Sequence, residues 1–196
     1  AMELFPDAPI YSLLYNRDIF LHTPIARQQV FTSFIEHLPL KRTHYRKYLP
    51  LMPFAIRRFD LRKYDTILSF SYAVAHGVKV QNGQKHLSYT FTPMRYAWRD
   101  VRLDGMPNKT SSMERIFRPF RSWDVSAATS VDQFAAVSSW IADWVTRVYR
   151  QNATVIYPPV DVERFSPQPE RGSYFIALSR LVPHKRVELI VDAFND

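Results

Sequence analysis

The chain has 196 residues, a net charge of +8, no cysteine, and 46% hydrophobic and 15% aromatic residues. This composition excludes a disordered chain, and the missing cysteine excludes disulfides and thiolate metal sites. The positive charge favours an anionic partner such as a nucleotide phosphate, a nucleic acid or an acidic lipid.

Short apolar runs alternate with helical patterns along the chain. The predicted strands are Ile10–Leu14, Thr66–Phe70, His86–Phe91, Phe134–Val137, Thr154–Ile156 and Tyr174–Leu178. Helical periodicity covers Tyr45–Arg58, Met113–Thr129 and Trp140–Tyr149, with Ser138 or Ser139 as the expected N-cap of the last helix. Strands of about five residues separated by helices predict parallel βαβ units in a layered α/β fold. No apolar run approaches the ~20 residues of a membrane-spanning helix.

The C-terminal part contains a predicted linker and a predicted phosphate site. The stretch Tyr157–Gly172, YPPVDVERFSPQPERG, has four prolines and a glycine, which is typical of a linker. Beyond it, SYFIALS has the pattern of a buried strand, and RVELIVDAF has the apolar spacing of a helix. The loop between them carries Arg180, Lys185 and Arg186. A strand, a basic loop and a helix start form the phosphate sites of many parallel α/β proteins.

These segments together resemble a known family. VIYPPVDVERFSP followed by SRLVPHKRVELIVDAF resembles the interdomain segment and donor loop of family 4 glycosyltransferases, which are retaining enzymes with the GT-B fold. LPLMPFAIRRFDLRKYDTILSFSYAVAHGV and SYTFTPMRYAW resemble the acceptor domain of its bacterial mannosyltransferase-like members. The similarity runs along nearly the whole chain in a consistent order.

The resemblance implies two Rossmann-like domains with mostly parallel sheets and flanking helices. Residues 1–157 would be most of the N-terminal acceptor-binding domain, residues 158–172 the interdomain linker, and residues 173–196 the start of the donor domain. A first strand with a Gly-rich loop would precede Ala1, and most of the donor domain would follow Asp196.

The resemblance also implies a function: transfer of a hexose, such as mannose, from a nucleotide-sugar to a saccharide or lipid-linked acceptor in envelope polysaccharide synthesis. Arg180 and Lys185 would hold the donor diphosphate, because fixed cations stabilise the negative charge that develops on the leaving group. No metal or other cofactor is expected. The enzyme would act in a longer form and the 196-residue chain alone would be inactive. A solvated basic loop is the structural alternative for Arg180 and Lys185.

The stretch SYTFTPMRYAW bears on catalysis and on the acceptor. Phe91 stands where the family usually has a histidine, and its ring can neither transfer a proton nor donate a hydrogen bond, so the catalytic residue is not identified. Thr92, Arg95, Tyr96 and Trp98 are the acceptor-side candidates, as a polar, basic and aromatic group suited to a sugar or a phosphate. The alternative for Tyr96 and Trp98 is packing in the core.

The stretch Lys41–Tyr64 carries many basic residues against one acid, Asp60, and tyrosines and apolar residues interleave them. The cations are Lys41, Arg42, Arg46, Lys47, Arg57, Arg58, Arg62 and Lys63. This pattern predicts either attachment to an anionic membrane surface or an ordinary helix with a solvated basic side. A cytoplasmic location is expected, with peripheral attachment to the inner face of the cell membrane left open.

Other interpretations of the chain stay open. The six histidines show no metal-ligand spacing, although His76 and Lys79 follow a predicted strand and could line a cleft. A non-catalytic acceptor- or membrane-binding module derived from such a transferase is the alternative to an enzyme, and it is consistent with Phe91. A nucleic-acid-binding domain would fit the charge, but the sequence has no recognised motif for one, so no nucleic acid is expected.

Overall fold

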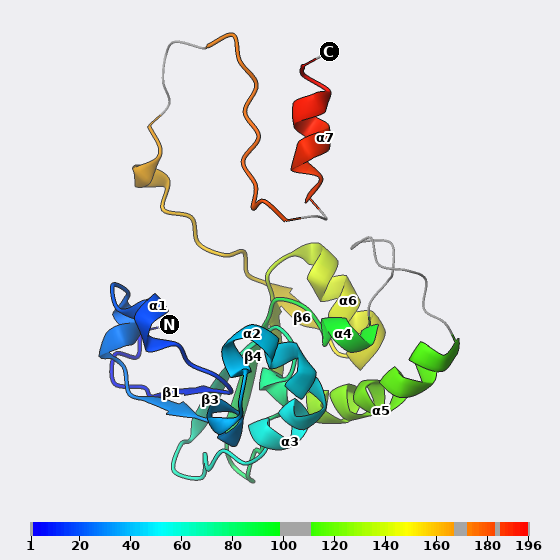
Figure 1. Cartoon of the computed structure of the whole chain (residues 1–196). Helices are drawn as coiled ribbons and strands as arrows, with labels where there is room; N and C mark the ends of the chain where they lie inside the picture. The colour runs from blue at the N-terminus through cyan, green and yellow to red at the C-terminus, as the bar shows by residue number, and fades with distance from the viewer. Residues whose placement is uncertain (1, 99–110, 167–171, 183–184, 196) are drawn as a thin grey trace.

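A computed structural model describes residues 2–98, 111–166, 172–182 and 185–195. The chain begins with a small parallel pair, β1 (Ile10–Ser12) and β2 (Val30–Thr32). Short helices surround this pair and lead away from it: α1 (Arg17–Phe20), η1 (Pro24–Arg27), η2 (Phe34–His37), α2 (Lys41–His44), η3 (Tyr45–Leu51) and α3 (Met52–Ile56). Figure 1 shows them as the blue and cyan part of the chain.

The main sheet has four parallel strands in the order β3-β4-β5-β6. They are β3 (Thr66–Ser71), β4 (Lys85–Thr90), β5 (Gln133–Ala136) and β6 (Ala153–Val155), and the connections between them contain η4 (Ala75–Gly77), α4 (Arg95–Trp98), α5 (Ser111–Ala128) and α6 (Ser139–Tyr149). The predicted α/β class with a parallel sheet flanked by helices is confirmed, and the arrangement is compatible with a Rossmann-like fold. Ser71 lies opposite Thr90, so the loops after β3 and β4 leave the sheet at the same edge.

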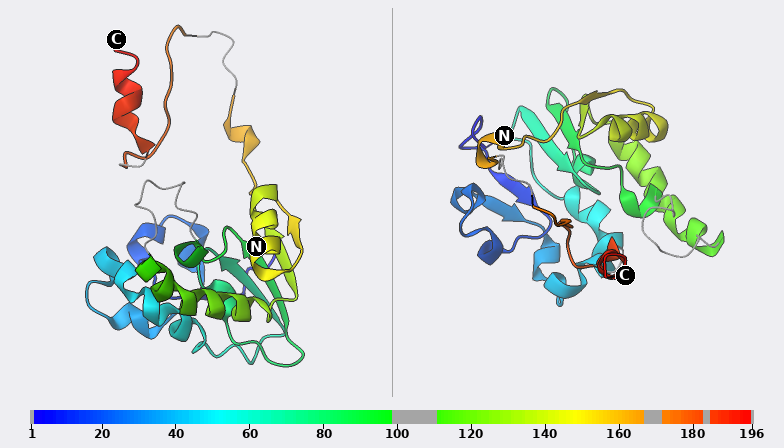
Figure 2. Two further views of the ribbon diagram at one scale, coloured as in Figure 1. Left: turned by 90° about the vertical axis from the view of Figure 1, so that its right-hand side faces the viewer. Right: turned by 90° about the horizontal axis from the view of Figure 1, so that it is seen from above.

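Helices cover one face of this sheet (Figure 2). Each strand from β3 to β6 lies beside the strand that precedes it in the chain, always on the same side. Right-handed crossover connections in such a sheet all lie on one face. The covered face of β3 and β4 carries mostly small polar side chains: Ile67, Ser69, Ser71, His86, Ser88 and Thr90, all buried. Helix α6 closes the other half of the face with Ile141 and Val145, which pack around Phe134 of β5.

The opposite face of the sheet is apolar and, within the described residues, open. Leu68 and Phe70 of β3 are 40% and 50% exposed, and Ile156 after β6 is 52% exposed. These side chains and Leu87 and Tyr89 of β4 contribute to a groove of about 700 Å³. Parallel sheets are normally covered on both faces, whereas this apolar face is left open by the described residues.

The α5 and α6 helices confirm the predicted ones to within two residues at each end. Ser138 is the N-cap of α6, because its Oγ accepts a hydrogen bond from the backbone N–H of Ile141 at 3.3 Å. The helix ends at Tyr149, and its C-cap, Arg150, has a φ of 59° in the left-handed region.

The Tyr45–Arg58 region is not one helix, as the periodicity predicted. It consists of the 3-10 helix η3 and the five-residue helix α3, with Pro50 inside the first and Pro53 in the first turn of the second. Each proline removes a backbone N–H and disfavours the α conformation of the preceding residue, so the α-helical hydrogen bonding cannot run through both. The three-residue strand β2 was not predicted.

The predicted strand Tyr174–Leu178 is also wrong. These residues form no strand in the structure, and Tyr174, Phe175, Ile176 and Leu178 are all more than 70% exposed. A strand needs a neighbour for its N–H and C=O groups, and in the described part of the chain no strand pairs with this segment.

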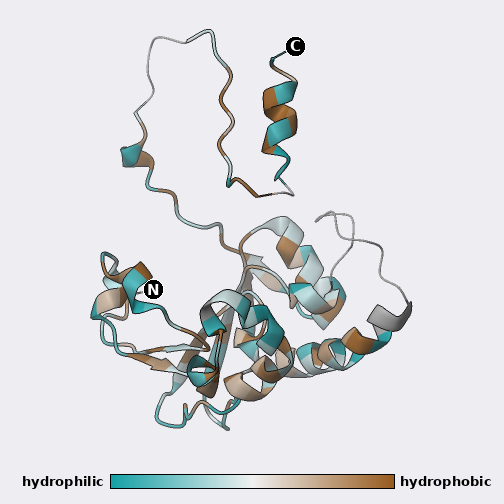
Figure 3. Ribbon diagram, viewed as in Figure 1, coloured by the Kyte–Doolittle hydropathy of each residue, from teal (hydrophilic) through white to brown (hydrophobic). Residues whose placement is uncertain are grey.

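Among the described residues of the C-terminal part, the helical elements are η6 (Val162–Arg164) and α7 (Val187–Asp192). Both figures show α7 standing apart from the sheet. The helix mixes hydrophobic and hydrophilic residues and buries none of them, although the rings of Phe175 and Phe194 are 4.5 Å apart (Figure 3). Residues 167–171 of the predicted linker and 183–184 of the predicted basic loop lie outside the described residues.

Candidate functional site

The loops that follow β3 and β4 place a basic and aromatic group at the carboxyl edge of the sheet, where parallel α/β proteins bind ligands. Tyr72 directly follows β3, and Arg95 and Tyr96 begin α4 after β4. The guanidinium carbon of Arg95 lies 5.5 Å from the centroid of the Tyr72 ring, within cation–π distance. Tyr72 is 46% exposed, and Arg95 and Tyr96 are half-buried, so the group reaches the surface.

Two further side chains from η3 join this group. Burial raises the pKa of the Tyr96 phenol, the phenols of Tyr45 and Tyr72 raise it further, and Arg46 and Arg95 lower it. Such interactions weaken with distance, so the five side chains share one neighbourhood. The Arg46 guanidinium donates to the Tyr45 hydroxyl at 3.4 Å and lies 5.8 Å from the centroid of that ring. We call these five residues the carboxyl-edge cluster.

The structure divides the acceptor-side candidates. Arg95 and Tyr96 belong to the cluster, whereas Thr92 is buried and donates its hydroxyl hydrogen bond to the carbonyl of Pro93 at 3.0 Å. Trp98 donates its indole N–H to Asp124 Oδ2 at 2.6 Å, so its polar atom is engaged inside the domain. The Thr92 hydroxyl and the Trp98 indole therefore stabilise the fold in this conformation.

Phe91 is the first residue after β4 and is 41% exposed. Its backbone N–H donates to the carbonyl of Ser71 at 2.8 Å, and its ring makes an edge contact with Tyr89, with the centroids 5.4 Å apart. Tyr89 borders the groove on the open face, so the Phe91 ring points to that side of the sheet. The position is accessible, but the ring has no group that exchanges a proton.

Arg180 and Lys185 are both exposed on a turn in which the Lys185 N–H donates to the carbonyl of Val182 at 2.9 Å. Arg186 has a φ of 49° and donates from Nε to the carboxylate of Glu188 at 3.1 Å. Its charge is therefore compensated locally, and Arg180 and Lys185 remain the candidate phosphate contacts of this loop.

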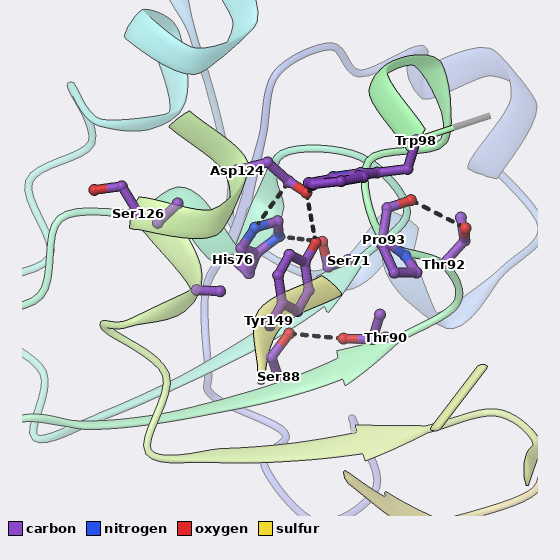
Figure 4. A network of polar contacts seen from close by, with 12 residues as sticks. Ser71, His76, Ser88, Thr90, Thr92, Pro93, Trp98, Asp124, Ser126 and Tyr149 are labelled. Atoms are coloured by element: carbon purple, nitrogen blue, oxygen red, sulfur yellow. Dashed lines mark hydrogen bonds and ion pairs between the residues drawn. The ribbon is translucent and has the colours of Figure 1, made fainter. Parts of the chain in front are cut away.

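A buried polar network lies between the sheet and α5 (Figure 4). His76 Nδ1 is 2.9 Å from Ser71 Oγ, and His76 Nε2 is 3.2 Å from Asp124 Oδ1. The second contact has the distance of an ion pair but not the alignment of a hydrogen bond. Asp124 Oδ2 also accepts from the Tyr149 hydroxyl at 2.8 Å. The carboxylate of Asp124 on α5 thus contacts α6 through Tyr149 and, through His76, the turn after β3 and Ser71 of β3. Its hydrogen bond from Trp98 connects α4 to the same network.

Ser71, His76 and Asp124 contact one another in the order found in the catalytic triad of serine hydrolases. They cannot act as a triad in this conformation. Ser71 and Asp124 are fully buried and His76 is 2% exposed. A nucleophile must reach a carbonyl of the substrate, and Ser71 has no accessible surface. The expectation that His76 lines a cleft is wrong, because the turn at Gly77 packs its backbone against α5, whereas Lys79 is exposed. A Cβ at Gly77 would lie 2.4 Å from the Trp123 ring, so this turn requires glycine.

A second buried histidine, His86 of β4, makes hydrogen bonds to β3 and to the segment before β5. His86 Nδ1 is 3.1 Å from the carbonyl of Ser130, to which it donates, so Nε2 accepts from the Ser69 hydroxyl at 2.9 Å. Burial lowers the pKa of His86 to about 4, and the nearby His76 lowers it as well. This imidazole is therefore neutral near pH 7 and stabilises the junction of β3, β4 and the start of β5.

The sequence analysis missed Tyr45, Arg46 and Tyr72 as one site and Asp124 as the centre of the buried network. Tyr72 had a signal, because it lies two residues after the predicted strand Thr66–Phe70, and parallel α/β proteins bind ligands beyond the carboxyl ends of their strands. An aspartate on the apolar side of a helix, within RSWDVSAA, was the signal for Asp124, because a buried carboxylate requires donors around it.

Within the described residues no group of three potential metal-ligating side chains comes together, and no helix there is long and apolar enough to cross a membrane. No protein-family model, curated protein or solved structure matches the sequence of the chain.

Proposed function

We propose that the chain forms the acceptor side of a glycosyltransferase that moves a hexose from a nucleotide-sugar to a saccharide or lipid-linked acceptor. The observation that carries the proposal is the carboxyl-edge cluster, a basic and aromatic group where a parallel sheet offers its ligand crevice. The ordered resemblance to family 4 glycosyltransferases supports it. The proposed enzyme acts in the cytoplasm, as a peripheral protein where its acceptor is lipid-linked.

The side chains suit the two substrates. Tyrosine rings offer flat surfaces for the apolar side of a sugar ring, and their hydroxyls and the guanidinium groups offer hydrogen bonds to its polar rim. Arg180 and Lys185 suit a diphosphate, because arginine binds two oxygens with its planar fork and lysine provides a point charge.

The proposed transfer breaks the bond between the anomeric carbon and the donor diphosphate and forms a glycosidic bond to an acceptor hydroxyl. The hydroxyl loses a proton in this step. Phe91 cannot accept it, so we assign the proton to the departing diphosphate, whose negative charge Arg180 and Lys185 stabilise as it develops.

The test is titration of the protein with nucleoside diphosphates and their sugars, followed by an assay of hexose transfer. Arg180→Ala and Lys185→Ala should each weaken diphosphate binding by roughly 1.5–3 kcal/mol, the range of hydrogen bonds to charged groups. Arg186→Ala is the matched control, since its guanidinium is paired with Glu188. Equal small losses at all three positions would indicate a diffuse basic surface and would count against a donor site.

A non-catalytic acceptor- or membrane-binding module is the second candidate. The observation that favours it is Phe91, an exposed residue at the sheet edge that cannot transfer a proton. Acceptor binding without hexose transfer from any nucleotide-sugar would select this candidate. Restored transfer in Phe91→His would show that the site retains the geometry of an enzyme.

A further inference from the structure

We infer that the carboxyl-edge cluster binds a phosphate-bearing ligand, with Arg46 and Arg95 on the phosphate and the tyrosine rings beside the attached group. This inference deepens the proposed function, and its identification of the attached group as a sugar rests on that function. The phosphate contact itself is argued from the residues of the cluster and does not depend on that function.

The charge of the site favours an anionic ligand. Three separate elements, η3, the residue after β3 and the start of α4, bring two guanidinium groups among three phenols. Within the described residues, the charged side chains that shift the pKa of the Tyr96 phenol are Arg46 and Arg95, both cations. A phosphomonoester carries close to two negative charges near neutral pH, which two guanidinium groups match.

The N–H donors of Arg46 suit a phosphate. The side chain is exposed, and its bond to the Tyr45 hydroxyl uses Nε, one of the five N–H donors of a guanidinium. Ring contact with Tyr45 restricts the plane of the guanidinium. A restricted fork loses less entropy when it binds two phosphate oxygens, which is the arrangement that arginine favours.

The aromatic surface beside the cations favours a ligand that carries a ring as well as a phosphate. Tyr72 is almost half exposed although Arg95 covers part of its ring, and Tyr96 is half-buried next to it. A neutral saccharide would displace water from two guanidinium groups without supplying a charge, which costs free energy. A sugar phosphate offers a ring for the tyrosines and an anion for the arginines.

The phosphate has two possible sources, a phosphorylated sugar and the headgroup of an anionic lipid. The test therefore uses a hexose 1-phosphate, the methyl glycoside of the same hexose, and vesicles containing phosphatidylglycerol. Binding is measured by titration calorimetry for the soluble probes and by co-sedimentation for the vesicles. Each variant is checked for its fold by circular dichroism.

The chain provides a matched control in the same basic region. Arg58 is exposed, and its guanidinium lies 5.3 Å from the centroid of the Phe54 ring, but it is outside the cluster. Arg46→Gln and Arg95→Gln should each weaken phosphate binding about tenfold or more, the effect of removing a charged hydrogen bond. Arg58→Gln should change it less than twofold. Arg46 is exposed, so its variant should fold even where Arg95→Gln does not.

Each outcome has a defined meaning. Binding of the hexose 1-phosphate but not of the methyl glycoside, with losses at Arg46, supports a phosphorylated sugar. Vesicle binding with the same variant dependence, in the absence of soluble binding, supports the phosphate contact with a lipid source. Equal losses at Arg46 and Arg58, equal affinity for the charged and neutral sugars, or no binding of any probe would overturn the inference.

Failure of the proposed function is distinguishable from failure of this inference. If the protein binds the hexose 1-phosphate through Arg46 but binds and uses no nucleotide-sugar, the glycosyltransferase proposal falls and the phosphate site stands. If it transfers a hexose with an unchanged apparent affinity for its acceptor in Arg46→Gln, the phosphate site falls and the proposed function stands.

Discussion

Replacement of Asp124 by leucine should destabilise the fold more than most single substitutions. The carboxylate is fully buried and accepts hydrogen bonds from Trp98 and Tyr149, while His76 Nε2 lies 3.2 Å from its other oxygen. Leucine has about the same size but accepts nothing. Two hydrogen-bond donors and one ring nitrogen would then be buried without a partner.

The magnitude follows from these contacts. A buried donor left without a partner costs about 1–3 kcal/mol, and the substitution leaves two such donors, the Trp98 indole N–H and the Tyr149 hydroxyl. We therefore expect Asp124→Leu to reduce the free energy of unfolding by about 4 kcal/mol, a large part of the roughly 5–15 kcal/mol typical of a domain. Asp124→Asn should cost less, about 1–2 kcal/mol. The amide oxygen can replace Oδ2, and His76 can change tautomer so that Nε2 accepts from the amide and Nδ1 donates to Ser71.

Urea denaturation followed by far-UV circular dichroism measures these differences, because it does not depend on the tryptophan next to the mutation. Asp143 is an exposed aspartate on α6, and Asp143→Leu is the matched control with an expected change within about 0.5 kcal/mol. A loss below about 1 kcal/mol for Asp124→Leu would refute the structural role of the network. Equal losses for asparagine and leucine would refute the tautomer argument.

Two further predictions concern a buried histidine and a helix cap. The pKa of His86 is about 4 in the folded state, below the ordinary value near 6.5, so the unfolded chain binds the proton first as the pH falls. The contribution of the neutral His86 imidazole to the free energy of unfolding is therefore complete above about pH 6.5 and falls by about 3 kcal/mol towards pH 4. His86→Gln should flatten this part of the stability profile in urea titrations, whereas exposed His22→Gln should keep it; an unchanged slope in His86→Gln would contradict the assignment. Ser138→Ala should lower the free energy of unfolding by about 1 kcal/mol, because Ile141 loses its N-cap acceptor, while Ser139→Ala in the same helix serves as the control. Similar thermal midpoints for both alanine variants would show that the cap contributes little.

The sequence by itself determined the local elements of the sheet and its main helices. The apolar runs at Thr66–Phe70 and His86–Phe91 and the apolar spacing of α5 and α6 are properties of neighbouring residues, as is the cap at Ser138. Parallel strands followed from their alternation with helices, and with them the common edge of the loops after β3 and β4. The amino-acid sequence was therefore sufficient to place Arg95 and Tyr96 at a ligand edge.

Only the tertiary structure decided which face of the sheet is covered and which side chains meet. In β3, Phe70 is exposed and Ser71 is buried, the reverse of what polarity alone predicts. The reason is the order of the strands, which puts every crossover on the side of Ser71, and strand order is not visible in local periodicity. In the same way, Asp124 meets Trp98 and Tyr149 at sequence separations of 26 and 25 residues. The carboxyl-edge cluster combines η3 with two loops of the sheet. Contacts of this kind depend on how the elements pack, so the composition of each segment indicated a basic and aromatic surface but not the site that these residues form together.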